Sequence, residues 1–282
     1  MKKLIAAKLK NEQLVQEMNA ALTETVGFRL WWLGQSGYVL QWNGKRIVMD
    51  PYLSDSLTKK YAHTEKPHVR MSELVLRPEL LENVAVVTSS HNHTDHLDAE
   101  TLVPILKNNP NIKFIVPEAN RAFVQQRVQC DLDFPVGLND GVSVTVDGFT
   151  FTGVPAKHNE LERDANGQCR YLGYIVRFGN HTVYHSGDTL WFSGMEDLLR
   201  PYGIDVALLP INGDRPERRV AGNLNAKEAV ALGKAIGADL VVPCHYDMFT
   251  FNTANVSDFV AEAKAQGQGH RVLLGGECLH MP

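Results

Sequence analysis

The sequence predicts an α/β fold arranged as a four-layer αββα sandwich, and three observations lead to this prediction. Strand-like and helix-like segments alternate through the middle of the chain. A second strand-rich block begins at Val142, so each half supplies a sheet with helices outside it. Polar clusters directly follow several strands, as they do at the ligand-binding edge of α/β sheets. We expect residues 1–282 to form one domain, with a site between the two sheets and neither half active alone.

The first part of the chain has the pattern of one helix and three strands. Residues 4–22 read as an amphipathic helix. That helix has two interpretations: it docks on its own sandwich, or it offers an apolar face to a second copy of the chain. Asn43 and Gly44 are a hairpin turn signal between the second and third strands. The three strands are expected at 28–33, 37–41 and 46–49.

The alternation continues to the end of the chain. Residues 83–90, NVAVVTSS, are a short β-branched run typical of a buried strand, and helical spacing starts at Leu97. Pro243 is expected to end the last strand. Further strands are expected at 149–154, 182–185 and 239–242, and helices at 101–107, 119–129, 226–236 and 256–266.

Three imidazoles and one carboxylate lie within six residues, on the turn between the strand at 83–90 and the helix after it. They are His91, His93, Asp95 and His96. Neutral imidazole and carboxylate together suit zinc, manganese or iron, and no cysteine lies nearby to favour a softer site. The cluster therefore predicts a metal centre, and the alternative is a polar surface loop with solvated histidines.

Three more candidate metal ligands follow later strands. His158 lies in PAKHNE after the strand at 149–154, and Asp188 lies in YHSGDT after 182–185. His245 lies in PCHYDMF after the last strand. Each alone is more often structural than functional. Four such positions in one order indicate a shared metal centre at one sheet edge.

This order, HxHxDH followed by His, Asp and His, resembles the metallo-β-lactamase fold superfamily of hydrolases over residues 28–251. Longer segments are similar to the L-ascorbate-6-phosphate lactonase branch, which in turn resembles the N-acyl-phosphatidylethanolamine phospholipase D group. These segments are LWWLGQSGY, SSHNHTDHLD, VYHSGDTLWFSGM, IDVALLPING and GADLVVPCHYDMF. The chain departs from the lactonase in length and around His158, so it is lactonase-like.

The resemblance implies a ligand set for two divalent metal ions, zinc or manganese, with iron also accepted. His91, His93 and His158 would hold one ion. The second ion would lie on Asp95, His96 and His245, with Asp188 bridging the two. Asp95 and Asp188 are the expected catalytic residues, and Asp95 is a candidate proton donor to the leaving group.

The resemblance implies a metal-dependent hydrolase, in which a metal-bound hydroxide opens the lactone of a sugar acid, phosphorylated or not. The alternative is a phosphodiesterase that acts on a small or lipid-derived phosphate ester. Oxygen-reducing diiron modules of this fold tend to have Glu at the position of His93, and a non-catalytic scaffold would have lost ligands. Both readings are therefore disfavoured.

Substrate contacts are less visible in the sequence. The loop NGDRPERRVAGN carries three arginines, whose planar guanidinium groups suit phosphate or carboxylate; they are Arg215, Arg218 and Arg219. The alternative is a solvated loop. Tyr246 is expected either to give its hydroxyl to the leaving group or to pack.

Other polar residues have two readings each. Asp50 ends the strand at 46–49 where the superfamily has an acidic residue beside the site, or it is a turn carboxylate before Pro51. His185 either supports a ligand or packs. The stretch 52–72, with His63 and His68, either forms a lid or lies on the surface.

Composition fits a cytoplasmic enzyme with a small-molecule substrate. The net charge of −4 gives no general attraction to nucleic acid or to an anionic membrane. No apolar run reaches the roughly 18 residues of a membrane span. Lysines interrupt the apolar start MKKLIAAKLK, so it does not fit a signal peptide. The four cysteines have no metal-site spacing and are expected to be reduced, with Cys244 in the core.

Overall fold

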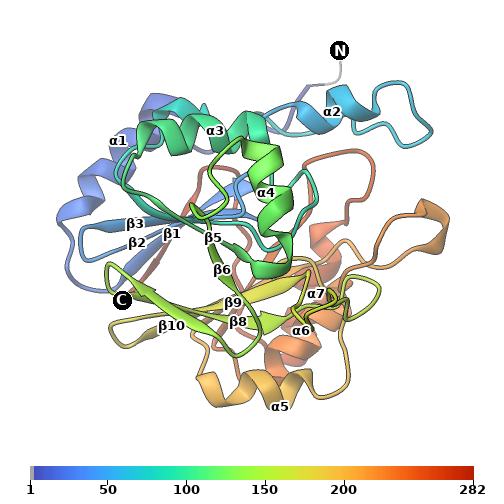
Figure 1. The fold of residues 1–282 in the computed structure, drawn as a ribbon. Helices are drawn as coiled ribbons and strands as arrows, with labels where there is room; N and C mark the ends of the chain where they lie inside the picture. The colour runs from blue at the N-terminus through green and yellow to red at the C-terminus, as the bar shows by residue number, and fades with distance from the viewer. Residues whose placement is uncertain (1–2) are drawn as a thin grey trace.

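The computed structural model describes residues 3–282, in which two β-sheets face each other and helices cover both outer sides (Figure 1). The first sheet has seven strands in the order β13-β1-β2-β3-β4-β5-β6. The second has six strands in the order β12-β11-β10-β9-β8-β7. The predicted four-layer sandwich is confirmed.

The first sheet begins as an antiparallel meander and continues in parallel from β3 to β6. Asn43 and Gly44 both have positive φ, 47° and 71°, as a tight hairpin turn between β2 and β3 requires. The C-terminal strand pairs with β1, an association of chain ends that no local pattern predicts. The strands are β1 (Phe28–Gly34), β2 (Gly37–Trp42), β3 (Lys45–Met49), β4 (Val84–Thr88), β5 (Lys113–Pro117), β6 (Val136–Leu138) and β13 (Cys278–Met281).

In the second sheet β10, β11 and β12 are parallel, and β9 runs antiparallel between β8 and β10. The strands are β7 (Ser143–Val146), β8 (Phe149–Pro155), β9 (Leu172–Phe178), β10 (His181–His185), β11 (Val206–Pro210) and β12 (Leu240–Cys244). The prediction that Pro243 ends β12 is wrong, since Pro243 pairs with Leu209 inside the strand. β12 is an edge strand, where the missing proline N–H costs no ladder bond.

The first sheet is apolar on both faces. Leu30 and Trp32 of β1 pack between the two sheets, whereas Trp31 and Leu33 pack under the outer helices. This alternation follows the two-residue period of a strand, and burial of both faces is usual for a sheet between layers. Two contiguous cores therefore fix the relative position of the sheets and hold the edge at which the site lies.

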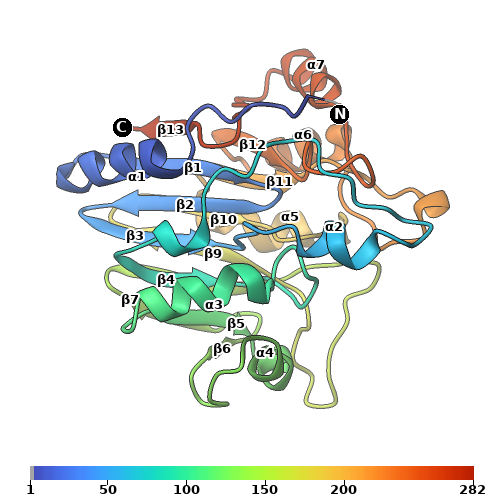
Figure 2. The same ribbon diagram turned by 90° about the horizontal axis from the view of Figure 1, so that it is seen from above.

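Helices α1, α3 and α4 lie over the first sheet, and α5, α6 and α7 over the second (Figure 1). Figure 2 looks down on the first helical layer, with α2 at the site end. The helices are α1 (Asn11–Ala20), α2 (Ser56–Tyr61), α3 (Ala99–Asn108), α4 (Arg121–Val128), α5 (Met195–Leu199), α6 (Ala226–Ala235) and α7 (Val256–Gln266). Short 3-10 turns occupy Ala21–Thr23, Pro78–Leu80, Glu118–Asn120, Arg200–Tyr202 and Pro216–Arg218. Every helix in residues 3–282 is too short or too polar to cross a bilayer.

The N-terminal helix is shorter than residues 4–22, because it begins only at Asn11. The segment before it is extended: Ile5 N–H donates to the Met71 carbonyl at 2.8 Å, and Lys8 N–H donates to the Gly275 carbonyl at 2.7 Å. Backbone partners far along the chain thus replace the helical bonds that the apolar pattern predicted. Leu14 and Met18 of α1 are buried in the outer core of the first sheet, so this helix docks on its own sandwich.

Candidate metal centre

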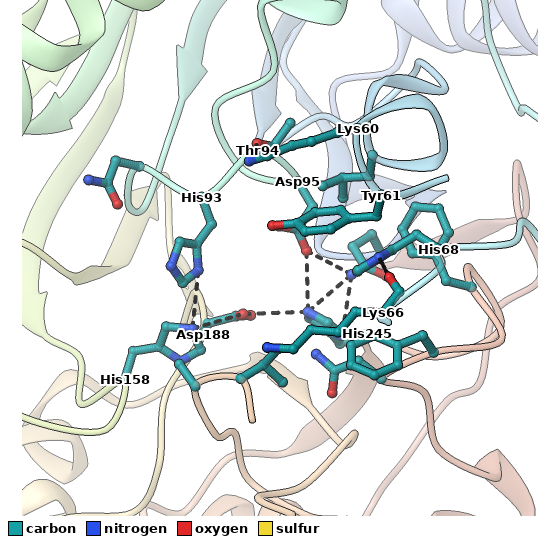
Figure 3. Close-up of a pocket in the computed structure, with 18 of the residues that line it drawn as sticks. Lys60, Tyr61, Lys66, His68, His93, Thr94, Asp95, His158, Asp188 and His245 are labelled. Atoms are coloured by element: carbon teal, nitrogen blue, oxygen red, sulfur yellow. Dashed lines mark hydrogen bonds and ion pairs between the residues drawn. The ribbon is translucent and has the colours of Figure 1, made fainter. Parts of the chain in front are cut away.

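The seven predicted ligands come together at one edge of the sandwich. Four of them follow β4, and the other three follow β8, β10 and β12 in turn; they are His91, His93, Asp95, His96, His158, Asp188 and His245. These strands end at the same edge, so residues from both sheets converge there (Figure 3). The N–H groups of His96 and Leu97 donate to the His93 carbonyl, at 3.1 and 2.8 Å, which closes the loop after β4 into a tight turn.

Three imidazoles form the first ligand group. One nitrogen from each of His91, His93 and His158 lies within 4.8 Å of the other two. His158 Nε2 is 3.3 Å from His93 Nδ1. Tetrahedral zinc ligands at 2.0–2.1 Å lie about 3.3 Å from one another, so this spacing fits a single ion.

A carboxylate and two imidazoles form the second ligand group. Ligand atoms of Asp95, His96 and His245 lie within 4.8 Å of one another. Asp95 Oδ2 is 3.4 Å from His245 Nε2 and 3.7 Å from His96 Nε2. His91, His96 and Asp188 form a third group of ligand atoms within 4.8 Å of one another, which overlaps the other two, so the implied division into two sets of ligands stays a prediction.

Asp188 lies between the two groups. Its Oδ1 is 3.4 Å from His96 Nε2, and its Oδ2 is 3.4 Å from His245 Nε2. The same Oδ2 is 3.7 Å from His158 Nε2, in the first group. A carboxylate in contact with both groups has the position that a bridging ligand needs.

Unpaired buried atoms test whether the cluster fits metal ions. His91 Nε2, His96 Nε2 and Asp188 Oδ1 are buried and have no hydrogen-bond partner among residues 3–282. An unpaired buried polar atom costs about 1–3 kcal/mol, so native proteins contain few of them. Two of these three atoms, His96 Nε2 and Asp188 Oδ1, lie 3.4 Å apart without hydrogen-bond geometry. All three atoms are of types that ligate divalent metals, so the cluster fits a centre that metal ions complete.

Asp50 supports the second group rather than capping a turn. The buried Asp50 carboxylate accepts from His96 Nδ1 at 2.7 Å, from Thr88 Oγ1 and the Ser90 N–H at 3.0 Å, and from the Ser90 hydroxyl. Its bond to Nδ1 leaves His96 Nε2 facing the cluster. In the first group, His158 Nδ1 donates to the Gly222 carbonyl at 2.9 Å. Such partners fix the orientation of ligating imidazoles.

The protonation of the two groups differs. Burial lowers the pKa of His91 and His158, and burial with neighbouring His158 lowers that of His93 to about 4. In the second group burial opposes the charged form, but Asp188 and Asp95 outweigh it. They raise the pKa of His96 well above its usual value and that of His245 to about 9. The first group is therefore neutral at pH 7 and the second carries protons.

Gln35 is a site residue that sequence reasoning missed. It lies on the tight turn between β1 and β2 with φ of 50°, and it is buried. Its Nε2 donates to Asp95 Oδ2 at 2.8 Å, and its carbonyl accepts from the His245 N–H at 3.1 Å. The motif LGQSGY was the available signal, since a polar residue there interrupts two buried strands.

A pocket of about 280 Å³ opens over the cluster. Five of the predicted ligands line it: His93, Asp95, His158, Asp188 and His245. The stretch 52–72 provides part of its wall through Leu57, Lys60, Tyr61, Lys66 and His68, whereas His63 is exposed. Further along the chain, Arg127, Val220, Phe249 and Phe251 contribute. Part of the stretch 52–72 thus walls the pocket.

Two contacts of Arg219 tie the loop after α2 to the loop before α6. The Arg219 guanidinium pairs with Glu65 at 2.6 Å, and its carbonyl accepts from Lys66 Nζ. We call this pair of contacts the strap. Both side chains of the ion pair are mostly exposed.

The other predicted substrate contacts lie elsewhere. Arg218 holds its own loop by donating to the Asn212 carbonyl at 2.7 Å and to the Thr253 carbonyl at 2.9 Å. Arg215 lines a separate hollow between α6 and α7. The Tyr246 hydroxyl donates to the Leu273 carbonyl at 2.6 Å and its ring stacks on Trp32, so Tyr246 packs and is no proton donor.

His185 is fully buried, and its Nε2 donates to the Ser36 carbonyl at 2.8 Å. That bond connects β10 to the turn that carries Gln35. His185 therefore helps to hold the two sheets together at the site.

Residues 45–246 match the family model described as beta-lactamase superfamily domain. The UPF0173 metal-dependent hydrolase of Methanoculleus marisnigri is 31% identical, over 82% of this chain and 86% of that protein. Igni18, a metallo hydrolase from Ignicoccus hospitalis, superposes with a TM-score of 0.66 at 23% identity, over 91% of this chain and 99% of its own. An isothiocyanate hydrolase from Delia radicum gut bacteria superposes with a TM-score of 0.72 at 20% identity, over 90% and 98%. These two structures agree in fold.

Proposed function

This chain belongs to the metallo-β-lactamase superfamily and, within it, to the UPF0173 metal-dependent hydrolases, and on that premise we propose that it is a dinuclear lactonase. The proposed substrate is the lactone of a sugar acid, phosphorylated or not. The observation that supports two ions is the position of Asp188, whose carboxylate lies 3.4–3.7 Å from imidazole nitrogens of both ligand groups. Zinc and manganese are the proposed ions, with iron also suited to the ligands.

When bound, two divalent ions would supply a hydroxide near neutral pH and polarise a substrate carbonyl. The first would be held by His91, His93 and His158, and the second by Asp95, His96 and His245. Asp50 and the Gly222 carbonyl orient His96 and His158 through their Nδ1 atoms. Because both sheets provide ligands, we propose that residues 1–282 act as one domain.

We assign proton transfer to Asp95. Burial raises its pKa, but His96 and His245 outweigh burial and hold it well below the usual value. Asp95 is therefore a carboxylate at neutral pH, and because its proton affinity is low, a proton that it takes from the attacking water is readily passed on. Gln35 Nε2 holds one of its oxygens at 2.8 Å. Returning that proton to the ring oxygen as the ester bond breaks completes the opening of the lactone.

A phosphodiester is the second candidate substrate. The same ligand groups suit attack on phosphorus, and three cationic side chains line the pocket: Lys60, Lys66 and Arg127. The expected cytoplasmic location and a homo-oligomeric state stay predictions.

Elemental analysis and paired assays test this function. Protein purified without chelator is expected to contain about two ions per chain and to hydrolyse glucono-δ-lactone. Activity should disappear on metal removal and return with zinc or manganese. Restored cleavage of bis(4-nitrophenyl) phosphate without lactone hydrolysis would select the second candidate. A folded metal-loaded protein that is inert toward both would contradict the proposal.

A further inference from the structure

One wall of the pocket, at its mouth, carries charge of one sign. Lys60, Lys66 and Arg127 line it, and the acidic residues among the described lining residues are Asp95 and Asp188, both in the metal centre. The three cations come from different elements: Lys60 from α2, Lys66 from the loop after it and Arg127 from α4. Their convergence is therefore not the result of one basic stretch of sequence.

Contacts place the cations around the pocket mouth. Lys60 Nζ lies 3.5 Å from Thr94 Oγ1, between His93 and Asp95 in the sequence. Lys66 Nζ reaches the Arg219 carbonyl on the other side of the mouth, and Figure 3 shows its side chain extended across the opening near His245. Arg127 Nη1 donates to the Leu97 carbonyl at 3.1 Å, next to the ligand turn.

The hydrogen-bond partners of all three cations are neutral oxygens, a hydroxyl and two backbone carbonyls. Lys60 and Arg127 also lie over the Tyr61 and Phe123 rings, which carry no charge either. Lys59, one residue before Lys60, differs, because its Nζ pairs with the Glu100 carboxylate at 2.8 Å. A neutral oxygen accepts a hydrogen bond from a cationic side chain but does not neutralise its charge. The pocket mouth therefore keeps its positive charge, which a ligand of opposite charge can neutralise.

The rest of this wall is apolar or uncharged. Tyr61 stacks on His68 at 4.5 Å between ring centroids, and His68 contacts Phe249 and Phe251 at 5.2 and 5.1 Å. Burial lowers the pKa of His68, so its ring is neutral at pH 7. An apolar strip beside a ring of cations is a binding surface for a compact organic anion.

We propose that Lys60, Lys66 and Arg127 form an anion-binding subsite at the pocket mouth beside the ligand groups, which selects esters that carry a carboxylate or phosphate group. This inference rests on the proposed function and deepens it by naming the substrate class. The ester group lies at the metal centre and the anionic group at the mouth, and the volume of about 280 Å³ limits the substrate to a small molecule. Lysine offers a mobile point charge and arginine a planar pair of donors, so carboxylate and phosphate share the same recognition.

Charge-removal variants test the subsite. The variants are Lys60→Gln, Lys66→Gln and Arg127→Gln, with Lys59→Gln as the matched control. Two esters with one leaving group serve as substrates: 4-nitrophenyl acetate, which is neutral, and mono-4-nitrophenyl succinate, which is anionic. Each pocket variant should raise KM for the succinate ester about tenfold and leave kcat unchanged, because the variant loses a charge-assisted hydrogen bond to the anionic group. The acetate ester and Lys59→Gln should show no change. Equal effects on both esters, or an equal effect of Lys59→Gln, would overturn the inference.

Equilibrium binding separates this inference from the proposed function. Calorimetric titration of metal-loaded protein with succinate and with inorganic phosphate needs no turnover, and elemental analysis checks that each variant holds the same metal. Weaker binding in the pocket variants, with Lys59→Gln unchanged, supports the subsite even if the protein hydrolyses neither ester, an outcome that would count against the proposed function alone. Binding that is the same in all four variants and the wild type would sink the subsite. The tighter of the two anions identifies whether carboxylate or phosphate is preferred.

Discussion

The two ligand groups have similar atoms but opposite protonation. Burial among other imidazoles lowers the pKa of all three histidines in the first group, whereas carboxylates raise the pKa of both histidines in the second. The first group is therefore ready to accept a cation, and the second must release protons first. Neighbouring charge, rather than residue type, therefore sets whether a group must lose protons before it binds a metal ion.

The difference also shows what holds each group together without metal. In the second group, imidazolium–carboxylate contacts join His96 and His245 to Asp95 and Asp188. In the first group the carboxylate contact is that of His158 Nε2 with Asp188 at 3.7 Å, and His91 Nε2, like His96 Nε2 in the second group, has no hydrogen-bond partner in the described chain. The second group therefore has more carboxylate contacts to keep its shape without metal, and each group has an imidazole nitrogen without a hydrogen-bond partner that a cation could bind.

Asp188→Asn should have the largest effect on activity, because Asp188 contacts both ligand groups and the substitution removes its negative charge from each. We expect kcat/KM to fall by roughly a thousandfold or more, since several kcal/mol of metal-dependent stabilisation is lost. Elemental analysis should show metal content falling from about two ions per chain. Asp197→Asn, at an exposed carboxylate of α5, is the control. Full activity of Asp188→Asn would show that Asp188 does not act as a bridging ligand.

Asp50→Asn should act on one group only. It weakens the contact that fixes His96, so the affinity of the second group for metal should fall about 10- to 100-fold while the first group keeps its ion. Competitive titration with a chromogenic chelator measures both affinities. Thr88→Val removes a different bond to Asp50 and serves as the milder comparison. An equal loss at both sites would show that Asp50 supports the fold rather than His96.

Metal binding should depend on pH in the second group and not in the first. His245, with a pKa of about 9, is protonated at pH 7, and a metal ion must displace that proton. Affinity should therefore rise about tenfold per pH unit for each proton released, up to about pH 9. His93, with a pKa of about 4, is already neutral between pH 6 and 8, so its group should show a flat profile. Calorimetry in buffers of different ionisation enthalpy counts the protons. Equal proton release from both groups would contradict the assignment.

The same pKa shift affects the stability of the metal-free protein, which should fall as pH rises, whereas the metal affinity of the second group should rise. The folded pKa of His245, about 9, lies above the unfolded value of about 6.5. Protonation of His245 therefore stabilises the metal-free fold fully below about pH 6.5, and this contribution is lost as pH rises toward 9. Thermal unfolding with excess chelator, compared between wild type and His245→Gln, measures it.

Gln35→Ala should have the smallest effect. It removes one hydrogen bond to Asp95 and leaves every ligand in place, so kcat should fall about fivefold with metal content unchanged. Gln35→Glu would add a negative charge beside Asp95 and is expected to reduce activity further. Loss of metal in Gln35→Ala would place Gln35 among the groups that hold the second ion.

Much of the site could be predicted because its residues follow strands directly. A local pattern identifies a strand, and the residue type after it suggests a ligand. The structure brings His158, Asp188 and His245 next to the first cluster, while their role as ligands stays a prediction. The pocket mouth could not be predicted in this way. Lys66 reaches it because tertiary contacts place the loop after α2, and nothing in the sequence near Lys66 encodes that position.

The errors in the fold have the same origin. Residues before Asn11 have an apolar pattern that suits a helix, but Met71 and Gly275 provide backbone partners that favour an extended chain. Pairing of β1 with β13 joins residues about 250 positions apart, beyond any local signal. Propensity alone predicts that Pro243 ends a strand, but Pro243 lies inside β12 because an edge strand tolerates proline.

The strap has a consequence for the timing of the reaction. Its ion pair between Glu65 and Arg219 is mostly exposed, and exposed pairs hold loops weakly. Loops tethered so lightly move on timescales of about nanoseconds to microseconds. Enzyme turnover typically takes about 1 ms to 1 s, so the mouth would open many times within each catalytic cycle. Entry of substrate would then add no slow step, and departure of the anionic product from Lys60, Lys66 and Arg127 would be the slower exchange with solvent.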